Sequence, residues 1–340
     1  MNSEIEIKPI GRETIEDQLV VYSSAFHSSK SLVENRHRWI KKHYENPLGD
    51  SLVFGAYIGG KLVGMNSYMP VEYNFQGRKI PMLQSCESGV ITEYQGKGIW
   101  SKVVRFAVDY IFKETKYKAI IGFPNYSNSY PGFKKMGWET LFDMQNYVLS
   151  NNPKQCAKII FPTKKYFQFF GRLIFLQRIM VSFHGLSAAN YNVSECDYSD
   201  LLWDDDPNFY TVSHTPELLK WKGDFRRIKA VQLKNSFETV ASCIYNISEY
   251  EGSPIIKIEK IVVKDSVKLK KAVACFLKYL YKHYPSIAFI RVWSTSDAKL
   301  TKVLKELMFV RSSHPNPFII KQPEKVFSNV NWNLSFFDLD

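Results

Sequence analysis

The junction at residues 90–100, VITEYQGKGIW, constrains the fold most, because an extended apolar run ends there in a glycine turn. The run LQSCESGVI before the turn reads as a strand, and SKVVRFAVDYIFK after it carries apolar residues at helical spacing. The first amides of a helix have no partners within it, and the helix dipole favours negative charge there. The junction therefore predicts an anion site at the start of a helix near residue 98.

The glycines in this junction have two interpretations. Glycine lets a pyrophosphate approach the backbone without a Cβ in the way. Alternatively, the turn between strand and helix needs glycine only for its backbone geometry. The junction is not a P-loop, because no Gly-Lys-Ser/Thr follows at the required spacing, and it lacks the third glycine of the dinucleotide fingerprint.

The spacing Gln95-x-x-Gly98 resembles the acetyl-CoA pyrophosphate loop of the GNAT superfamily of acyltransferases. Downstream, PNYSNSYPGFKKMGW at 124–138 is similar to the family's next motif, in which an Asn opens a helix that ends near Lys-Leu-Gly-Phe. The resemblance covers about residues 1–150 and implies that acetyl-CoA is the co-substrate and that no metal is needed. The residues that it implies for CoA binding are Gly89, Val90, Ile91, Gln95, Gly96, Lys97, Gly98, Ile99, Trp100, Ser101, Asn125 and Ser127.

Two positions depart from the family pattern. Trp100 stands where the family usually has Gly or Ala, which changes the angle at which the helix start holds its ligand. Phe133 stands where many members carry the tyrosine that protonates the departing thiolate. Tyr130, one helical turn earlier, is the candidate acid, with ordinary packing as the alternative.

Transfer of an acetyl group to an amine requires a base for the ammonium proton and donors for the developing oxyanion. The resemblance assigns the donors to backbone amides around 89–91. Glu87 on the same strand is the candidate base, because burial would raise the pKa of its carboxyl towards neutrality. The alternative is a strand-face glutamate bonded to a neighbour. A covalent route through Cys86 is a weaker hypothesis, because no histidine lies near it in sequence.

The order of predicted elements indicates an α/β protein with two GNAT-like domains, each a mixed central sheet flanked by helices. We predict a catalytic, acetyl-CoA-binding domain at 1–150, a helical linker at 151–189 and a degenerate domain at 190–340. Predicted strands near 228–234, 238–247 and 255–263, followed by a helix at 266–283, repeat the first domain's order. The matching junction, IVVKDSVKLKK, has no glycine, so we expect this half to bind no CoA and to shape the acceptor site.

Residues 153–183 read as aromatic helix that carries only basic charges. We expect this segment to pack its apolar face between the two domains. The alternative is a helix that lies on a membrane surface or binds a partner.

The net charge of +12 comes from 45 Lys and Arg residues that are spread along the chain. No nucleic-acid motif accompanies them, so we expect no nucleic-acid partner. The charge is either a generally basic surface or a field that steers polyanions such as CoA and a nucleotide-linked substrate. The five cysteines are scattered and the N-terminus lacks the form of a signal peptide, which favours the cytoplasm. No apolar run is long enough for a transmembrane segment, and we expect a monomer or weak dimer.

Together these features predict an acetyl-CoA-dependent N-acetyltransferase that acts by direct transfer to a primary amine. Duplicated GNAT proteins of this size resemble enzymes found with bacterial surface-polysaccharide pathways. That resemblance implies a nucleotide-linked amino sugar, such as a UDP-bound 3-amino sugar, as acceptor. The alternatives are an acyl- or aminoacyltransferase that acts on a peptide or antibiotic amine, and a non-catalytic module that senses acyl-CoA or binds a partner.

Overall fold

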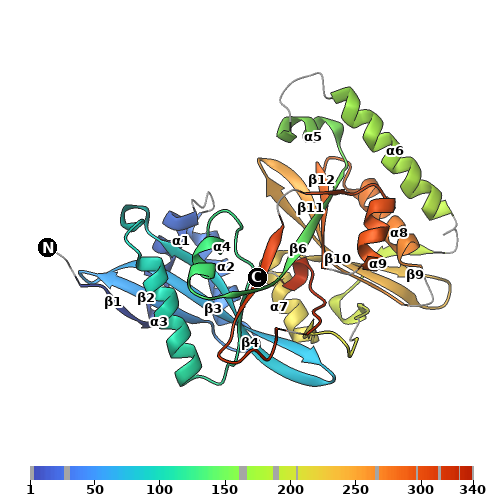
Figure 1. Ribbon diagram of the computed structural model, residues 1–340. Coiled ribbons are helices and arrows are strands. Elements are labelled where there is room, and N and C mark those ends of the chain that lie inside the picture. Colours follow the sequence, from blue (N-terminus) through green and yellow to red (C-terminus); the bar gives the residue numbers. More distant parts are fainter. Residues whose placement is uncertain are drawn as a thin grey trace.

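The computed structural model describes residues 4–26, 31–160, 167–186, 191–203, 206–264, 268–295, 298–312, 315–328 and 330–338. Figure 1 shows two halves side by side. The N-terminal half comprises β1 (Glu6–Ile10), α1 (Ile15–Phe26), α2 (Leu32–Tyr44), β2 (Leu52–Ile58), β3 (Lys61–Phe75), β4 (Arg78–Val90), α3 (Ile99–Glu114), β5 (Ile120–Gly122), α4 (Tyr130–Lys135) and β6 (Glu139–Ser150).

The C-terminal half begins with two helices, α5 (Pro153–Ile160) and α6 (Phe167–Leu186). It continues with β7 (Asn192–Glu195), β8 (Thr211–Val212), α7 (Pro216–Arg226), β9 (Lys229–Lys234), β10 (Thr239–Tyr250), β11 (Ser253–Val263), α8 (Leu269–His283), β12 (Phe289–Ser294), α9 (Ala298–Glu306), β13 (Val310–Arg311), β14 (Asn316–Lys321) and a 3-10 turn η5 (Phe336–Asp338).

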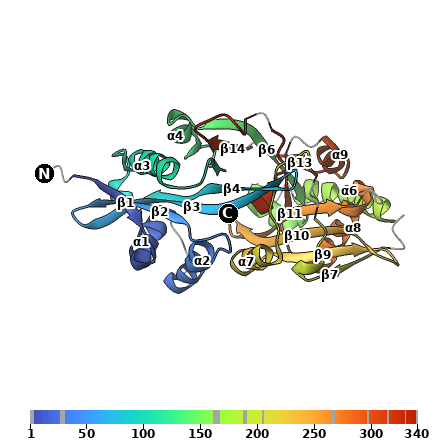
Figure 2. The same cartoon turned by 90° about the horizontal axis from the view of Figure 1, so that it is seen from below.

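The strands form one mixed sheet that passes through both halves. Its order is β1-β2-β3-β4-β5-β14-β6-β12-β11-β10-β9-β7, while β13 pairs with β6 and β8 with β3. In the N-terminal half, α3 and α4 cover one face of the sheet and α1 and α2 the other (Figure 2). The predicted α/β class with a mixed sheet flanked by helices is confirmed.

Local sequence explains the elements that frame the site. Helix α3 buries Val103, Val104, Ala107 and Ile111, which recur at helical spacing. The turn between β3 and β4 places Gln76 and Gly77 at φ 51° and 74°, in the left-handed region that a tight hairpin requires.

The two halves are joined by an exchanged strand. Strand β14 belongs to the C-terminal half in sequence, but it lies between β5 and β6 and runs antiparallel to both. The first part of β6 pairs with β14, and its last six residues, Gln145–Ser150, pair with β12. The N-terminal half therefore completes its sheet with β14, which follows residue 150 in sequence. The C-terminal half completes its sheet with the end of β6, which precedes that boundary.

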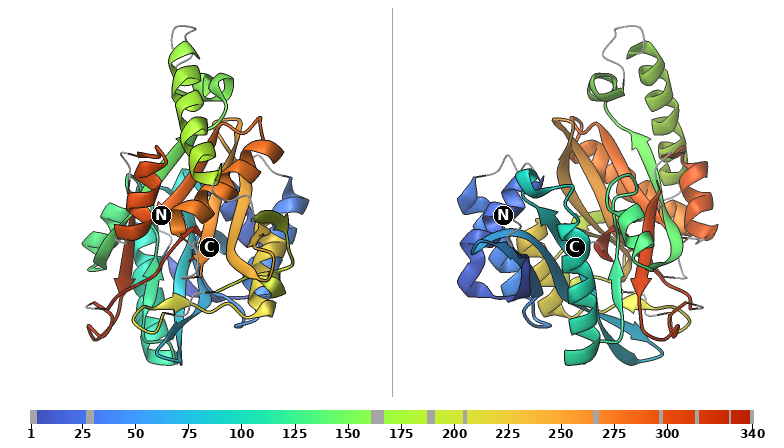
Figure 3. Two further views of the ribbon diagram at one scale, coloured as in Figure 1. Left: turned by 90° about the vertical axis from the view of Figure 1, so that its right-hand side faces the viewer. Right: turned by 60° about the vertical axis from the view of Figure 1, so that its left-hand side comes forward.

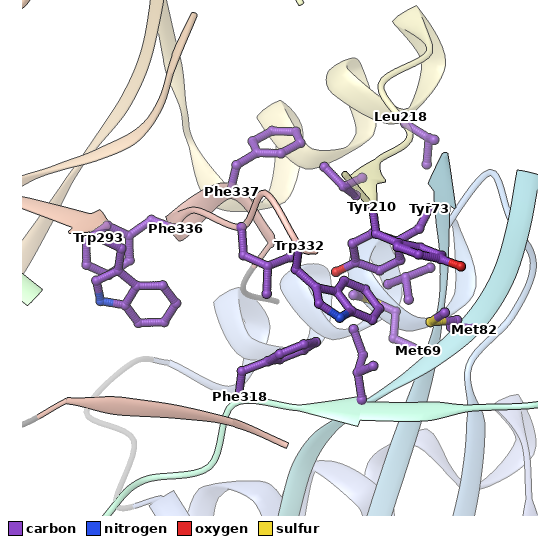
Figure 4. Packing of buried hydrophobic residues seen from close by; sticks show 14 of the residues in the cluster. Met69, Tyr73, Met82, Tyr210, Leu218, Trp293, Phe318, Trp332, Phe336 and Phe337 are labelled. Carbon is purple, nitrogen blue, oxygen red and sulfur yellow. The ribbon is translucent and has the colours of Figure 1, made fainter. Parts of the chain in front are cut away.

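A hydrophobic core also spans the two halves (Figure 4). Met69, Tyr73 and Met82 come from β3 and β4. They pack with Tyr210, Leu218, Trp293, Phe318, Trp332, Phe336 and Phe337 from the C-terminal half. The C-terminal turn η5 enters this shared core, where Phe336 stacks on Trp293 with ring centroids 4.2 Å apart. Because this aromatic surface is shared, we expect the two halves to unfold together.

The C-terminal half repeats the strand directions of the first. Strands β2, β3 and β4 form an antiparallel meander, and α3 then leads to β5, which is parallel to β4. In the second half β9, β10 and β11 are likewise antiparallel, and α8 leads to β12, which is parallel to β11. The strands and the helix predicted from 228 to 283 correspond to β9, β10, β11 and α8.

Helix α6 does not lie between the halves, and the expectation that residues 153–183 pack there is wrong for the described part of this segment. Helix α6 packs on α8 and α5, and both views in Figure 3 show it projecting from one end of the molecule. The exchanged strand and the shared core already join the halves, so no helix is needed between them. Residues 161–166 of this segment lie outside the described residues. Within the described residues, no helix is both long and apolar enough to span a bilayer.

Candidate active site

The site begins where β4 and β5 part. The two strands pair only over Leu83–Ser85 and Ile120–Gly122, and β5 then ends while β4 continues to Val90. Among the described residues, no strand therefore lies beside residues 86–90 of β4 on that edge. An open strand edge exposes amides and carbonyls that can pair with an extended ligand.

A β-bulge marks the start of this open edge. Tyr68 of β3 lies opposite Ser85, but Asn66 lies opposite Ser88, so Cys86 and Glu87 together face Ser67. The Ser67 hydroxyl donates to the main-chain carbonyl of Glu87 at 3.3 Å. Bulges bend a strand and redirect its side chains, and this one follows directly after the last residue that pairs with β5.

The β3–β4 hydrogen bonds decide which amides point into the opening. The amide of Ile91 donates to the Val63 carbonyl at 2.9 Å, and in an antiparallel pair the bonded positions alternate. The amides of Gly89 and Ile91 are therefore directed at β3. Those of Ser88 and Val90 are directed at the open edge.

Beyond Val90 the chain turns through the predicted glycine corner into α3. Gly96 and Gly98 have φ 76° and 71°. An added Cβ would meet nothing within 4 Å at Gly96 and only Ser101 Oγ, at 3.9 Å, at Gly98. Steric contact with the rest of the protein is therefore not the reason for glycine at either position. The positive φ favours glycine, and a ligand that approaches the backbone would favour it too.

The helix begins at Ile99 with Gly98 as its N-cap, and no side chain caps it. The first amides of this 16-residue helix thus remain available to an anion. Around them, the Gln95 side-chain amide donates to the Val90 carbonyl at 3.0 Å, and Ser101 Oγ donates to the Gly98 carbonyl at 2.9 Å. Lys97 lies over the Tyr94 ring, with its Nζ 5.0 Å from the centroid. This corner fits a pyrophosphate.

Glu87 faces helix α2 across the bulge. Its Oε1 accepts from Lys42 Nζ at 2.5 Å, and its Oε2 lies 3.1 Å from His43 Nε2. Burial alone raises the pKa of the Glu87 carboxyl, but Lys42 and His43 outweigh it and hold the pKa well below its usual range. The expectation of a raised pKa is therefore wrong, because it did not include the two partners from α2.

Trp100 spans the space above the opening. Its indole Nε1 donates to the Ser88 hydroxyl, and its ring meets Phe133 edge to face with centroids 5.0 Å apart. A Cβ on Gly132 would lie 2.3 Å from the Trp100 ring, so α4 packs closely on this tryptophan. Trp100 thus joins β4 to α4.

The predicted acid and the turn before it are both engaged within the protein. Tyr130 Oη lies 2.9 Å from Thr140 Oγ1, and either oxygen can donate. Phe133 is buried against Trp100 and Trp138. Asn125 Oδ1 accepts from the amide and the hydroxyl of Ser127, at 3.0 and 2.8 Å. These bonds shape the turn, and α4 begins only at Tyr130.

The comparisons with known proteins agree with this geometry. Residues 6–141 match the sequence model of the acetyltransferase (GNAT) domain. The chain carries a GNAT acetyltransferase domain. No curated protein matches the chain, so its relatives come from solved structures. The solved structures described next are 12–14% identical and support the GNAT fold alone.

The whole chain is similar to several solved GNAT structures. A probable N-acyltransferase from Enterococcus faecalis is 14% identical with a TM-score of 0.65, over 94% of this chain and 73% of that one. A GCN5-related N-acetyltransferase from Anabaena variabilis is also 14% identical, with a TM-score of 0.60 and the same coverage. A tandem GNAT protein from the clavulanic acid biosynthesis pathway is 12% identical, with a TM-score of 0.58 over 94% of this chain and 98% of that one.

A small pocket of the GNAT domain lies beside Glu87 on the α1 and α2 side of the sheet. Its lining residues are Tyr22, Asn35, Arg38, Trp39, Lys42, His43 and Glu87. Lys42 is buried and paired with Glu87, whereas Arg38 is partly exposed, so Arg38 is the cation that this pocket offers to a ligand. In the described part of the chain, His, Cys, Asp and Glu side chains form no group of three that could hold a metal ion.

Sequence reasoning missed Lys42, His43 and Arg38, which determine the charge around Glu87. Their only sequence signal is the basic run HRWIKKHY at the end of α2. Such a run is usually a solvent-exposed helix face, yet here Lys42 and His43 are buried, with side chains 3% and 0% exposed. The packing of α2 over the bulge, which sequence does not reveal, turns them inward.

Proposed function

We propose that this protein is an acetyl-CoA-dependent N-acetyltransferase whose acceptor is the primary amine of a nucleotide-linked (UDP- or dTDP-) amino sugar. The observation that carries the proposal is the open edge of β4 that ends at the glycine corner. Acetyl-CoA supplies an acetyl group activated as a thioester. The first amides of α3 would bind its pyrophosphate, and Gly96 and Gly98 would let that group approach.

The open edge of β4 would hold the pantetheine arm as an added strand. The Ser88 and Val90 amides, which point into the opening, would hydrogen-bond the thioester carbonyl and the oxyanion that develops from it. Of the residues that the resemblance places there, Val90 keeps this role. Gly89 and Ile91 would instead hold β4 against β3.

Glu87 remains the candidate base. Because its pKa is held low, it is ionised at neutral pH and well suited to bind and orient an ammonium group, but it retains a proton poorly. The proton would therefore pass on to solvent. Tyr130 remains the candidate acid, although it would have to leave Thr140. The leaving thiolate also needs little help, because a thiol has a pKa of about 8.5.

The pocket beside Glu87 supports an acceptor that carries negative charge. Arg38, which is partly exposed, would attract the diphosphate of a sugar nucleotide, while Glu87, held by the buried Lys42, accepts the amine. The rings of Tyr22 and Trp39 line the same pocket and offer apolar surface for a sugar ring. A polycationic antibiotic would meet Arg38 with charge of the same sign, so this residue disfavours it.

The test is release of free thiol from acetyl-CoA in the presence of a UDP-linked amino sugar, the free amino sugar, a peptide amine and an aminoglycoside. We expect release chiefly with the nucleotide-linked sugar. Arg38→Ala should raise the KM for that acceptor at least tenfold and leave the KM for the free sugar unchanged. Arg36→Ala on the same helix, where Arg36 pairs with Glu16 on an exposed face, is the matched control.

Other outcomes identify the alternatives. Preference for the aminoglycoside or the peptide would overturn the sugar-nucleotide acceptor and retain the transferase. CoA binding without thiol release for any amine would favour a module that senses acyl-CoA.

A further inference from the structure

Helix α6 is apolar on both of its faces. One face is buried: Val181 packs in the core cluster that contains α8, and Ile174 packs in a cluster with residues of α5, β11 and β12. On the same face Gln177 donates to the Met308 carbonyl at 3.2 Å. At 100° per residue, the opposite side of the helix carries large apolar side chains that are exposed. They are Phe175 (65% exposed), Leu176 (51%), Ile179 (47%) and Phe183 (67%). We call these four residues the α6 stripe.

A helix that is apolar all round is normally buried all round. Here one face packs on α8 and α5, and α6 itself stands at the end of the C-terminal half that is remote from the N-terminal half (Figures 1 and 3). The other half of the chain therefore does not cover the stripe. Exposed apolar surface of this size usually marks an interaction site.

The charge around the stripe indicates what covers it. The sequences of α5, α6 and α8 contain no Asp or Glu. They contain eight Lys and Arg residues, namely Lys154, Lys158, Arg172, Arg178, Lys270, Lys271, Lys278 and Lys282. Arg172 is exposed at a position within the angular range of the stripe, and Arg178 lies over the Tyr281 ring at 5.2 Å.

This charge argues against a second copy as the occupant. A symmetric dimer through the stripe would bring the same three helices together from both subunits. Positive charges would then face positive charges, with no carboxylate from these helices between them. An anionic surface would meet the same charges favourably.

We propose that the α6 stripe docks on the surface of an anionic lipid bilayer. Phe175, Leu176 and Ile179 would enter the boundary between head groups and acyl chains, and Arg172 would reach up to the phosphates. Lys270 is paired with Glu306 of α9 at 2.8 Å, and the other basic residues of α5 and α8 would add attraction to anionic lipid. Because the inner face of α6 is packed on α8, the helix lies along the surface. The proposal does not rest on the assigned enzymatic activity.

The test is co-flotation of the full chain with vesicles of phosphatidylcholine alone and of equal parts phosphatidylcholine and phosphatidylglycerol. We expect binding to the anionic vesicles only, weakened by salt. The double variant Phe175→Ser/Ile179→Ser should bind them at least tenfold more weakly, and so should Arg172→Glu/Arg178→Glu. Phe237→Ser, which removes a phenylalanine that is 95% exposed at the β9–β10 turn, is the matched control and should bind as the wild type does.

Three results would overturn the proposal. They are absence of binding to anionic vesicles, equal binding to neutral ones, and loss of binding in the control variant equal to that in the stripe variants. A wild-type dimer in light scattering that Phe175→Ser/Ile179→Ser dissociates would assign the stripe to a second copy instead. The melting temperature of each variant verifies its fold. Thiol release from acetyl-CoA, measured in parallel, should be the same in the stripe variants as in the wild type. This measurement tests the assigned activity independently of lipid binding.

Discussion

Replacement of Gly98 by glutamate should abolish CoA binding and leave the fold intact. With φ at 71°, a non-glycine residue costs roughly 1–2 kcal/mol of stability. A carboxylate at a helix N-terminus returns about 0.3–1 kcal/mol. The added Cβ has only Ser101 Oγ within 4 Å, at 3.9 Å, so no steric cost is expected at this atom and the net loss of stability is about 1 kcal/mol. The variant should therefore melt only a few degrees lower.

Binding should suffer far more, because the carboxylate would lie where the pyrophosphate must approach. Two like charges about 4 Å apart repel by roughly 4 kcal/mol near a protein surface, which is about a thousandfold in Kd. Gly77→Glu is the matched control, since Gly77 has φ 74° and no atom within 4 Å of an added Cβ. It lies at the far end of β4, about 40 Å from Val90 by strand rise. Calorimetric titration with CoA should show loss in Gly98→Glu alone. Equal affinities in the two variants would refute the assignment of the corner.

Three further changes test the site and the joined halves. Glu87→Gln should lower turnover at least tenfold with CoA affinity unchanged. Because the pKa of Glu87 is held well below its usual range, its carboxylate should stay ionised between roughly pH 5 and 8 and cause no change of rate with pH there. A pH dependence in that range that disappears in Glu87→Gln would contradict the assigned ion pair. The same low pKa means that the stability contributed by the pair is present above about pH 4.3, the ordinary glutamate value, and is lost as pH falls further. A chain that ends at residue 150 should not fold, because β5 and β6 lose β14 between them; a soluble, CoA-binding fragment in circular dichroism and titration would show that the exchange is dispensable. Phe318→Ala, at a fully buried position in the shared core, should cost about 3–5 kcal/mol in urea unfolding and retain one cooperative transition, whereas two separate transitions would mean that the halves unfold independently.

The sequence was sufficient for the elements whose signal is local. The left-handed backbone of the corner favours glycine, and the apolar spacing after it is that of a helix, so residues 96–111 were predictable. The meander of β9, β10 and β11 was predictable for the same reason, since each strand is bounded by turn residues.

What depends on contacts between distant residues was not predictable. Nothing in the residues of β14 indicates that it joins β5 and β6 rather than a sheet of its own half. The pKa of Glu87 likewise depends on Lys42 and His43, which are 45 and 44 positions away. Burial alone gave the wrong direction, because the partners that reverse it come from another helix.

The repeat of the strand order extends to the ion pair at the bulge. In the second half β11 pairs with β12 over Ile256–Ile258, and Glu259 follows in a bulge opposite β10. Arg226, the last residue of α7, donates to Glu259 at 2.6 Å, as Lys42 of α2 does to Glu87. In both halves, a glutamate at the bulge thus forms an ion pair with a cation from a helix that precedes the strand in sequence.

Features that both halves share are explained by the fold, and features of the first half alone are candidates for ligand binding. The paired glutamate is present in both halves, so its first role is to hold a helix over the bend in the strand. Two features distinguish the first half. Glu87 is 16% exposed and lines a pocket, whereas the side chain of Glu259 is fully buried. The strand of the first half also leads into a glycine corner, whereas the second half has none between β11 and α8. A partly exposed carboxylate on the strand and a glycine corner after it are the two features that the proposed transferase would require, and only the first half has both.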